Sequence, residues 1–320
     1  MPKRKAGHPP PEPGVDIKNS RWFIEFTTPH EAHMHAMKRF IAAVDSPFQK
    51  VEIAESYQFG RCLMLDGKMQ SAEKDEFIYH EALVHPALVT HPNPKRVAII
   101  GGGEGATMRH CIMHRTVEKC WMIDIDQAVM DLSRKYLPEW GGGIWRDRRC
   151  IIRAADGRKF LERSKRGSFD VIIIDLSEPV PGGPSYLLFT KEFYRIVADK
   201  LGPDGVISLQ CASTSAPDLN MHAMIIRTLR TVFPHVRAFS IEVPAFDLPW
   251  GIAVAGKTQD PVRLAGYEVD RRLADRGVRG LKYYDGVTHE GIFKVPRYLR
   301  DAYAAPGDII TDDSPLFTSI

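Results

Sequence analysis

Two carboxylates follow a run of aliphatic residues near the middle of the chain. Residues 171–174 read Val-Ile-Ile-Ile, Asp175 comes next, and Glu178 precedes the turn sequence Pro-Val-Pro-Gly-Gly-Pro. A short aliphatic run of this kind is typical of a strand buried on both faces of a parallel sheet. Ligands bind beyond the carboxyl ends of such strands. Asp175 and Glu178 are therefore candidates for proton transfer and for binding a cation.

A glycine turn with an acid inside it ends an earlier aliphatic segment. The stretch GGGEGATMR at 101–109 places Gly101, Gly102 and Gly103 directly before Glu104. Glycines let the backbone turn sharply and approach a ligand closely, and such a turn alone serves NAD, FAD or a nucleoside. The carboxylate of Glu104 would repel a pyrophosphate or an α-carboxylate, and it would attract an amine.

Two more acids stand where the next strands end. Asp124 lies in IDID, at the distance of about 20 residues from the glycine turn that suits an acid bound to ribose hydroxyls. Asp156 and Gly157 close the following strand, where a carboxylate can accept a hydrogen bond from the exocyclic amine of adenine. A glycine turn, a ribose acid and an adenine acid together indicate an S-adenosyl ligand rather than a dinucleotide.

The elements that must position these groups alternate between strands and helices from Lys95 onward. This alternation predicts an α/β fold, a Rossmann-like, methyltransferase-type parallel sheet with helices on both faces, preceded by a small antiparallel β domain. The segments 236–244 and 250–257 read as terminal strands, and residues 75–91 as a helix closed by Pro92 and Pro94. The predicted organisation is a flexible tail over 1–20, an N-terminal β domain with a linking helix over 21–94, and a Rossmann-like catalytic domain over 95–320.

Composition narrows the class of protein. The net charge of +3 is too small to indicate a nucleic-acid partner, and the apolar runs are too short for a membrane helix or a signal peptide. Five scattered cysteines without a CxxC pair indicate reduced thiols in the cytoplasm. The histidines of HEAHMH at 30–35 fit no standard metal site and predict a surface or helix-start role, and HEALVH at 80–85 lacks the HExxH spacing of a zinc protease.

Over residues 48–256 the chain resembles the polyamine aminopropyltransferases, the family of spermidine, spermine and thermospermine synthases. The resemblance is carried by MLDGKMQSAEKDEFIYHEALVHPAL, GGGEGATMR, IDID, ADG and DLSEPVPGGPSYLLFTKEFY. It implies that decarboxylated S-adenosylmethionine is a co-substrate, that no cofactor or metal is required, and that a polyamine amine accepts the aminopropyl group. It also implies a homodimer or homotetramer.

The resemblance also assigns roles to residues by position. Asp175 matches the catalytic acid, with Tyr79 beside the reacting nitrogen. The acceptor side is implied for Glu178, His80, Gln210, Phe246 and Trp250. The donor side is implied for Gln49, Gln70, Gly101, Gly102, Gly103, Glu104, Asp124, Asp156, Gly157 and Pro184.

Two departures from the spermidine synthase pattern favour a longer acceptor. The loop DLSEPVPGGP is one residue longer than in many spermidine synthases, and VPAFDLPWG carries Phe246 and Trp250 where these enzymes often have Tyr and a smaller residue. Both features resemble thermospermine synthases, and we therefore expect spermidine as the acceptor. The alternatives are a spermidine synthase that uses putrescine, an S-adenosylmethionine-dependent methyltransferase, and a non-catalytic homologue. The segment TDDSPLF at 311–317 fits a latch or a loose end equally well.

Overall fold

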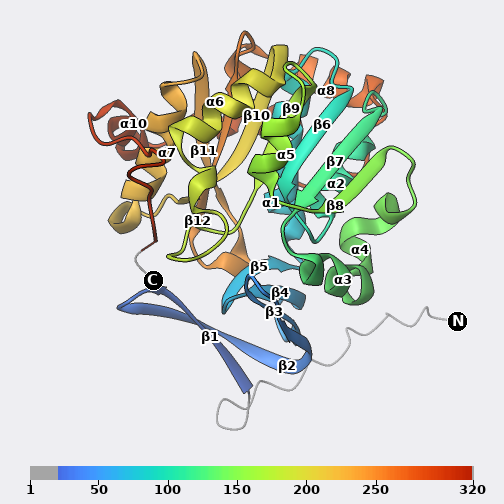
Figure 1. Cartoon of the computed structure of the whole chain (residues 1–320), viewed down its shortest axis with the longest axis vertical. Helices are drawn as coiled ribbons and strands as arrows, with labels where there is room; N and C mark the ends of the chain where they lie inside the picture. The colour runs from blue at the N-terminus through green and yellow to red at the C-terminus, as the bar shows by residue number, and fades with distance from the viewer. Residues whose placement is uncertain (1–20, 319–320) are drawn as a thin grey trace, which may run out of the picture.

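The computed structural model describes residues 21–318 and contains two β-sheets (Figure 1). A five-stranded sheet lies below a larger seven-stranded sheet, to which helices are packed. The Rossmann-like fold after a small antiparallel sheet, predicted from the alternation of strands and helices, is confirmed. The flexible tail predicted for residues 1–20 lies outside the described residues, and the division into domains at residues 94 and 95 stays a prediction.

The N-terminal sheet is an antiparallel meander with strand order β1-β2-β3-β4-β5. Its strands are β1 Arg21–Thr28, β2 Glu31–Asp45, β3 Lys50–Ser56, β4 Gly60–Leu65 and β5 Lys68–Ala72. The first two form a long hairpin that projects from the body of the molecule, in blue in Figure 1. At the tight turn between β4 and β5, Asp66 and Gly67 both have positive φ, of 47° and 74°. Asp-Gly is a preferred pair for a two-residue hairpin turn of this kind.

The large sheet has the order β11-β12-β10-β9-β6-β7-β8. Its strands are β6 Arg96–Gly101, β7 Lys119–Asp124, β8 Cys150–Ala154, β9 Phe169–Asp175, β10 Leu201–Ser213, β11 His235–Glu242 and β12 Pro249–Gly256. The five strands from β10 to β8 are parallel neighbours, whereas β12 pairs antiparallel with both β10 and β11. The terminal strands predicted from sequence thus form an antiparallel hairpin at one edge.

Ten α-helices accompany these strands within the described residues. They are α1 Glu76–Thr90, α2 Ala106–Met113, α3 Gln127–Tyr136, α4 Pro138–Gly141, α5 Gly157–Arg163, α6 Lys191–Lys200, α7 Asn220–Arg230, α8 Gly266–Asp275, α9 Gly286–Ile292 and α10 Arg297–Ala304. The predicted helix over 75–91 corresponds to α1, which ends before Pro92 as expected for a residue that precedes proline. Over residues 21–318 the structure contains no helix with both the length and the apolar character that crossing a membrane requires.

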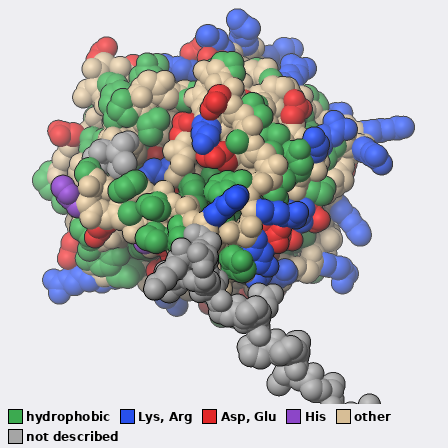
Figure 2. Space-filling model, turned by 90° about the horizontal axis from the view of Figure 1, so that it is seen from below, with side chains coloured by type: hydrophobic (Ala, Val, Ile, Leu, Met, Phe, Trp, Pro, Cys, Tyr) green, Lys and Arg blue, Asp and Glu red, His purple; other side chains and the backbone are tan. Residues whose placement is uncertain are grey.

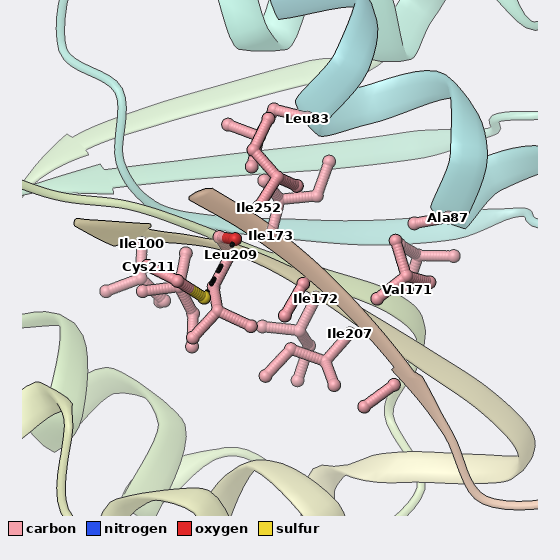
Figure 3. Close-up of a cluster of buried hydrophobic side chains, with 14 of the residues drawn as sticks. Leu83, Ala87, Ile100, Val171, Ile172, Ile173, Ile207, Leu209, Cys211 and Ile252 are labelled. Carbon is pink, nitrogen blue, oxygen red and sulfur yellow. Dashed lines mark hydrogen bonds between the residues drawn. The ribbon is translucent and has the colours of Figure 1, made fainter. Parts of the chain in front are cut away.

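The core is built around the central strands of the large sheet. Residues 171–174 of β9 are completely buried, as are Ile207 and Leu209 of the neighbouring strand β10. Figure 3 shows Leu83 and Ala87 of α1 against one side of these strands, with other helices on the opposite side. Because both faces of the sheet are covered, β9 has only aliphatic side chains between Asp170 near its start and Asp175 at its end.

The strand ends bring the candidate groups to one edge. Gly101 at the end of β6 stands in register with Asp175 at the end of β9, and Asp124 ends β7 in the same direction. The backbone amide of Gly102 donates a hydrogen bond of 2.9 Å to the carbonyl of Asp175. The glycine turn and the catalytic-acid candidate are therefore fixed to each other by main-chain contacts.

The structure decides the conformation of three further segments of the chain. The helix-start alternative for HEAHMH is wrong, because residues 31–35 belong to strand β2. The expected turn at residues 202–205 lies inside β10, whose pairing with β9 shifts register there. The C-terminal segment 310–318 is docked on the body: Asp312 accepts two hydrogen bonds from the guanidinium of Arg158, at 2.5 and 2.9 Å, and the amide of Thr318 donates to the carbonyl of Pro179 at 2.8 Å.

Replacing Gly101 by alanine should destabilise the fold strongly. Gly101 has φ +85°, and an added Cβ would lie 2.0 Å from the carbonyl oxygen of Asp175. We expect Gly101→Ala to lower the free energy of unfolding by about 3 kcal/mol, the sum of left-handed strain and overpacking. Gly67→Ala is the matched control, since φ is +74° but no atom lies within 4 Å of the added carbon. Urea unfolding that shows equal losses for both variants would contradict this account.

Candidate active site

A cavity of about 270 Å³ opens at the carboxyl ends of the parallel strands and is closed from below by the N-terminal sheet. Of the residues that the sequence singled out, those in its wall are Gln49, Gln70, Tyr79, Gly101, Gly102, Gly103, Glu104, Asp124, Asp156, Gly157, Asp175, Glu178, Pro184, Gln210, Phe246 and Trp250. Residues far apart in the chain thus meet in one cavity. The exception is His80, which lies behind this wall.

Asp175 stands at the centre of the cavity wall. Its Oδ1 accepts a hydrogen bond of 2.7 Å from the hydroxyl of Tyr79, and its Oδ2 accepts one of 2.5 Å from Thr107. Burial raises the pKa of Asp175, as does the nearby carboxylate of Glu104, while His80 and the two hydroxyls act in the opposite direction. A carboxylate with a raised pKa is a better proton acceptor for an amine than a solvent-exposed one.

His80 contacts Glu104 instead of the cavity, which corrects the predicted place of His80 in an amine channel. Its Nε2 is 2.8 Å from Glu104 Oε1, and its Nδ1 is 2.8 Å from Glu76 Oε2. Burial disfavours the charged imidazole, but the two carboxylates outweigh burial and raise the pKa of His80 to about 10. Arg109 binds the other oxygen of Glu76 at 2.7 Å. An imidazolium therefore holds Glu104 in place from behind.

The glycine turn is shaped around Asp124. The backbone amide of Gly103 donates to Asp124 Oδ2 at 2.9 Å, and the amide of Asp126 donates to Oδ1 at 2.8 Å. A Cβ at Gly103 would lie 2.7 Å from the same Oδ2, so only glycine fits there. Burial is the main cause that raises the pKa of Asp124 to about 6. The arrangement leaves a half-buried acceptor beside a backbone that a ligand can approach closely.

The remaining donor-side candidates lie around the same end of the cavity. The side-chain amide of Gln49 donates to Asp126 at 3.0 Å, and Asp156 caps helix α5 by accepting from the amide of Lys159 at 3.0 Å. Gly157 packs against Ile100, where an added Cβ would come within 2.4 Å. These contacts fix the shape of the wall where β6, β7 and β8 end.

Aromatic rings form the part of the cavity wall next to Asp175. The ring of Phe246 packs edge-on against Tyr79, with centroids 5.9 Å apart, and against Trp250, with centroids 5.5 Å apart. Such rings can bind a methylene chain and attract a cation. Gln210 lies in this wall too, but both ends of its side-chain amide are occupied. Its Nε2 donates to the carbonyl of Leu176 at 2.9 Å, and its Oε1 accepts from the backbone amide of Ala212 at 2.8 Å. Gln210 therefore fixes the start of the loop after β9.

Sequence reasoning missed further charged residues in the cavity wall, namely Glu25, Asp66, Lys68, Arg158 and Asp218. Of these, Glu25, Lys68 and Asp218 lie near Glu178. Burial raises the pKa of Glu178 and that of Glu25 each to about 7; Lys68 lowers both values, and Asp218 raises that of Glu178. These four groups are therefore neighbours. A signal for Glu25 existed, because the alternation in RWFIEFTT places it on the inward face of β1.

Three groups, His80, Glu104 and Asp175, each offer an atom within 4.8 Å of the others, as ligands of a cation would. His80 Nε2 and Glu104 Oε1 are hydrogen-bonded to each other, and both oxygens of Asp175 already accept from hydroxyl groups. Over residues 21–318, no Lys or Arg forms an ion pair with Glu104, Asp175 or Glu178. The cavity therefore offers carboxylates without a Lys or Arg ion pair, which suit ammonium groups.

Family models and curated relatives all match this chain to spermidine and spermine synthases or polyamine aminopropyltransferases. A family model described as "Spermine/spermidine synthase domain" matches residues 76–264, and one described as "Spermidine synthase tetramerisation domain" matches residues 21–73. The chain is 40% identical over 297 residues to a polyamine aminopropyltransferase of Sulfolobus acidocaldarius, covering 93% of this chain and 98% of the relative. It is 41% identical over 305 residues to a polyamine aminopropyltransferase of Synechococcus sp., covering 92% and 96%.

Solved structures give the same result. A spermidine synthase in complex with the transition-state analogue AdoDATO superposes with a TM-score of 0.82 at 33% identity, over 89% of this chain and 95% of the other. The spermidine synthase from Thermotoga maritima has the same TM-score and coverage at 32% identity.

Glu178 should make the stability of the ligand-free protein depend on pH. Its pKa rises from 4.5 to about 7 on folding. The folded state therefore keeps a proton that the unfolded state releases, and this stabilisation, present below pH 4.5, is lost as the pH rises through 7. We expect Glu178→Gln to match the parent protein at pH 4 and to be more stable by about 3 kcal/mol at pH 8, since one pKa unit corresponds to about 1.36 kcal/mol. Denaturant unfolding at both pH values measures this difference.

Glu31→Gln is the matched control, because Glu31 is exposed on the hairpin. This variant should follow the parent protein at every pH. A Glu178→Gln variant with the same pH profile as the parent would show that Glu178 is ionised in the empty site.

Proposed function

The chain belongs to the polyamine aminopropyltransferase family of transferases, and we propose that it moves the aminopropyl group of decarboxylated S-adenosylmethionine to spermidine. The products would be thermospermine or spermine and 5'-methylthioadenosine. The observation that carries this proposal is that Glu104 and Asp175 lie in the wall of one cavity. Glu104 is 2.8 Å from His80, and over residues 21–318 neither carboxylate forms an ion pair with a Lys or Arg. Such a site suits a cationic donor that lacks a carboxylate.

The donor would lie along the ends of β6, β7 and β8. Asp124 would accept from the ribose hydroxyls, and Asp156 from the adenine amine, with Gln49, Gln70 and Pro184 around the nucleoside. Glu104, held by His80, would bind the ammonium of the aminopropyl arm. This contact would fix the reactive methylene beside Asp175 and so lower the entropic cost of reaction.

The acceptor must lose a proton before its nitrogen can attack. An amine with a pKa near 10.4 is neutral in only about one of a few thousand molecules at pH 7, a cost of roughly 4–5 kcal/mol. Asp175 would accept this proton. Tyr79 donates its own hydroxyl hydrogen to Asp175, which leaves its oxygen free to accept an N–H of the same amine.

The transfer itself is a displacement at carbon. The nitrogen lone pair forms the new N–C bond, the C–S bond breaks, and its electron pair returns to sulfur, so that the sulfonium leaves as a neutral thioether. The proton lost by nitrogen passes to Asp175. Because the sulfonium is already a good leaving group, the step calls for positioning and deprotonation, and the proposal includes neither a metal nor a further cofactor.

A triamine fits the charges at the other end of the cavity. After one nitrogen of spermidine has become neutral, two ammonium groups remain, and Glu178, Glu25 and Asp218 lie in the wall beyond Asp175. Phe246 and Trp250 would cover the methylene chain. Putrescine would need only one of these carboxylates. The wall composition therefore supports the longer acceptor.

The same proposal includes a cytoplasmic homotetramer. The match to a tetramerisation domain over residues 21–73 supports assembly through the N-terminal sheet. Ile24, Phe26, Met34, Phe40 and Val44 of the first hairpin are exposed. Figure 2 shows hydrophobic side chains gathered on the face seen from the hairpin side. All five cysteines are free thiols, which supports a reducing compartment.

A product assay tests the proposal. The protein is mixed with decarboxylated S-adenosylmethionine and, in separate tubes, putrescine, agmatine, cadaverine, spermidine and norspermidine. Chromatography that resolves spermine from thermospermine identifies the product. We expect a tetraamine from spermidine. Product from putrescine alone would assign a spermidine synthase, and absence of product with retained S-adenosylmethionine binding would assign a methyltransferase.

Asp175→Asn provides the internal control for this assay. The amide cannot accept the proton of the amine, although its shape and its contacts with Tyr79 and Thr107 are largely retained. We expect turnover to fall by at least about a thousandfold, in line with loss of a general base combined with misplacement of the amine. Binding of the donor, measured by calorimetry, should persist. Loss of donor binding would instead assign Asp175 a structural role.

A further inference from the structure

Two histidines of the N-terminal hairpin contact the loop that carries Phe246. His33 Nδ1 lies 3.0 Å from Asp247 Oδ2, and His35 Nε2 lies 3.3 Å from the same oxygen, in a charge contact without hydrogen-bond alignment. His35 is buried, and its ring packs against Phe23 and Phe59. The HEAHMH motif, which the predicted chemistry did not use, thus reaches the edge of the active site.

Strand pairing explains why these histidines face inward. In the ladder between β1 and β2, His33 stands opposite Glu25 and His35 opposite Phe23. Residues directly opposite each other in an antiparallel pair point to the same face. The inner face of the hairpin therefore carries Glu25 into the cavity wall and, beside it, the two histidines toward Asp247.

Asp247 has a backbone conformation that needs support. Its φ is +55° and its ψ is 9°, in the left-handed region that costs a residue other than glycine free energy. It directly follows Phe246 at the end of the 3-10 turn Pro244–Phe246, and Asp75 holds the preceding Ala245 through the backbone amide at 2.7 Å. The loop of Phe246 is therefore held on one side by His33 and His35 and on the other by Asp75, all of which precede the large sheet in the chain.

We propose that His33, His35 and Asp247 form a clamp that positions Phe246, the aromatic wall between Tyr79 and Trp250, for the methylene chain of the acceptor. The three are positioning residues. The inference rests on the proposed function, because it assigns them a part in binding the acceptor. If the clamp opens, Asp247 loses the contacts that offset its left-handed backbone, and the ring of Phe246 loses its fixed place.

Charge strengthens the clamp. Asp247 is near two other carboxylates, Glu25 and Asp75, since its charge contributes to the raised pKa of each. Against this repulsion His33 and His35 place their imidazoles beside Asp247, where each supplies positive charge when it is protonated. The clamp thus also balances a carboxylate that would otherwise add to the crowding at the acceptor end of the cavity.

Four variants test the clamp. Asp247→Asn removes the charge but keeps a residue that tolerates the left-handed backbone. His33→Gln and His35→Gln remove the basic partners and keep a polar side chain. His30→Gln is the matched control, because His30 is exposed on the same hairpin and its side chain makes no contact with Asp247.

Two readouts are taken on each variant. Hydrogen exchange of residues 244–249, followed by mass spectrometry, reports the loop independently of catalysis. Steady-state kinetics report KM for the acceptor and for the donor. For Asp247→Asn and His33→Gln we expect faster exchange in this loop. We also expect the KM for the acceptor to rise about three- to fivefold, the effect of losing a partly exposed ion pair, while the KM for the donor stays unchanged. His30→Gln should match the parent protein in both readouts.

Each outcome decides the proposal. Unchanged exchange in the clamp variants overturns it, whatever the activity. Faster exchange with equal changes in acceptor and donor KM also overturns it, because the loop would then have only a structural role. If the parent protein turns over no polyamine, the proposed function fails separately. Hydrogen exchange, together with calorimetry of spermidine binding, then decides whether the clamp serves a polyamine site.

Discussion

The repulsion between carboxylates gathered at one edge of the parallel sheet is the constraint on which this structure depends. Two like charges about 4 Å apart repel by about 4 kcal/mol at an effective dielectric constant near 20. Glu104 and Asp175 face this cost where water reaches them only in part, and Glu178 and Glu25 face it a short distance away. The protein offsets it with His80 behind Glu104 and two hydroxyl donors on Asp175. The part left uncompensated favours a cationic ligand.

Helix α1 carries two of the groups that offset this repulsion. It presents Tyr79 to Asp175 and, on the next residue, His80 to Glu104. Its register is in turn fixed by the buried Glu81, whose carboxylate accepts backbone hydrogen bonds from residues 282–284, the shortest being 2.8 Å from the amide of Tyr283. On the other side of the cavity the N-terminal hairpin supplies Glu25 and holds the loop of Phe246. The proposed donor end thus depends on the large sheet together with Gln49 and Gln70 of the N-terminal region, and the proposed acceptor end also depends on both parts.

The local sequence was enough to predict the parts of this arrangement that are positioned by the ends of strands. Gly101, Asp124 and Asp175 could be placed because each ends an aliphatic strand, and parallel strands share one carboxyl edge. The parallel sheet with helices on both faces and the two terminal strands followed from the same alternation, whereas the order of the strands was not predicted. The hairpin residues could not be placed, because the contact of His33 with Asp247 joins positions 214 residues apart (247 minus 33) and no local pattern records it. His80 was assigned to the cavity because it matches the same family motif as Tyr79. Only Tyr79 lies in the cavity wall, since adjacent helical residues point in different directions.

A comparison of two ligands by calorimetry tests the central claim most directly. Decarboxylated S-adenosylmethionine and S-adenosylmethionine differ at this site only in the carboxylate that Glu104 and Asp175 would repel. The account predicts that the decarboxylated form binds at least about tenfold more tightly, a difference of roughly 1.4 kcal/mol, and that Glu104→Gln narrows the gap. Equal or tighter binding of S-adenosylmethionine would contradict the account, since the carboxylates would then not select the donor.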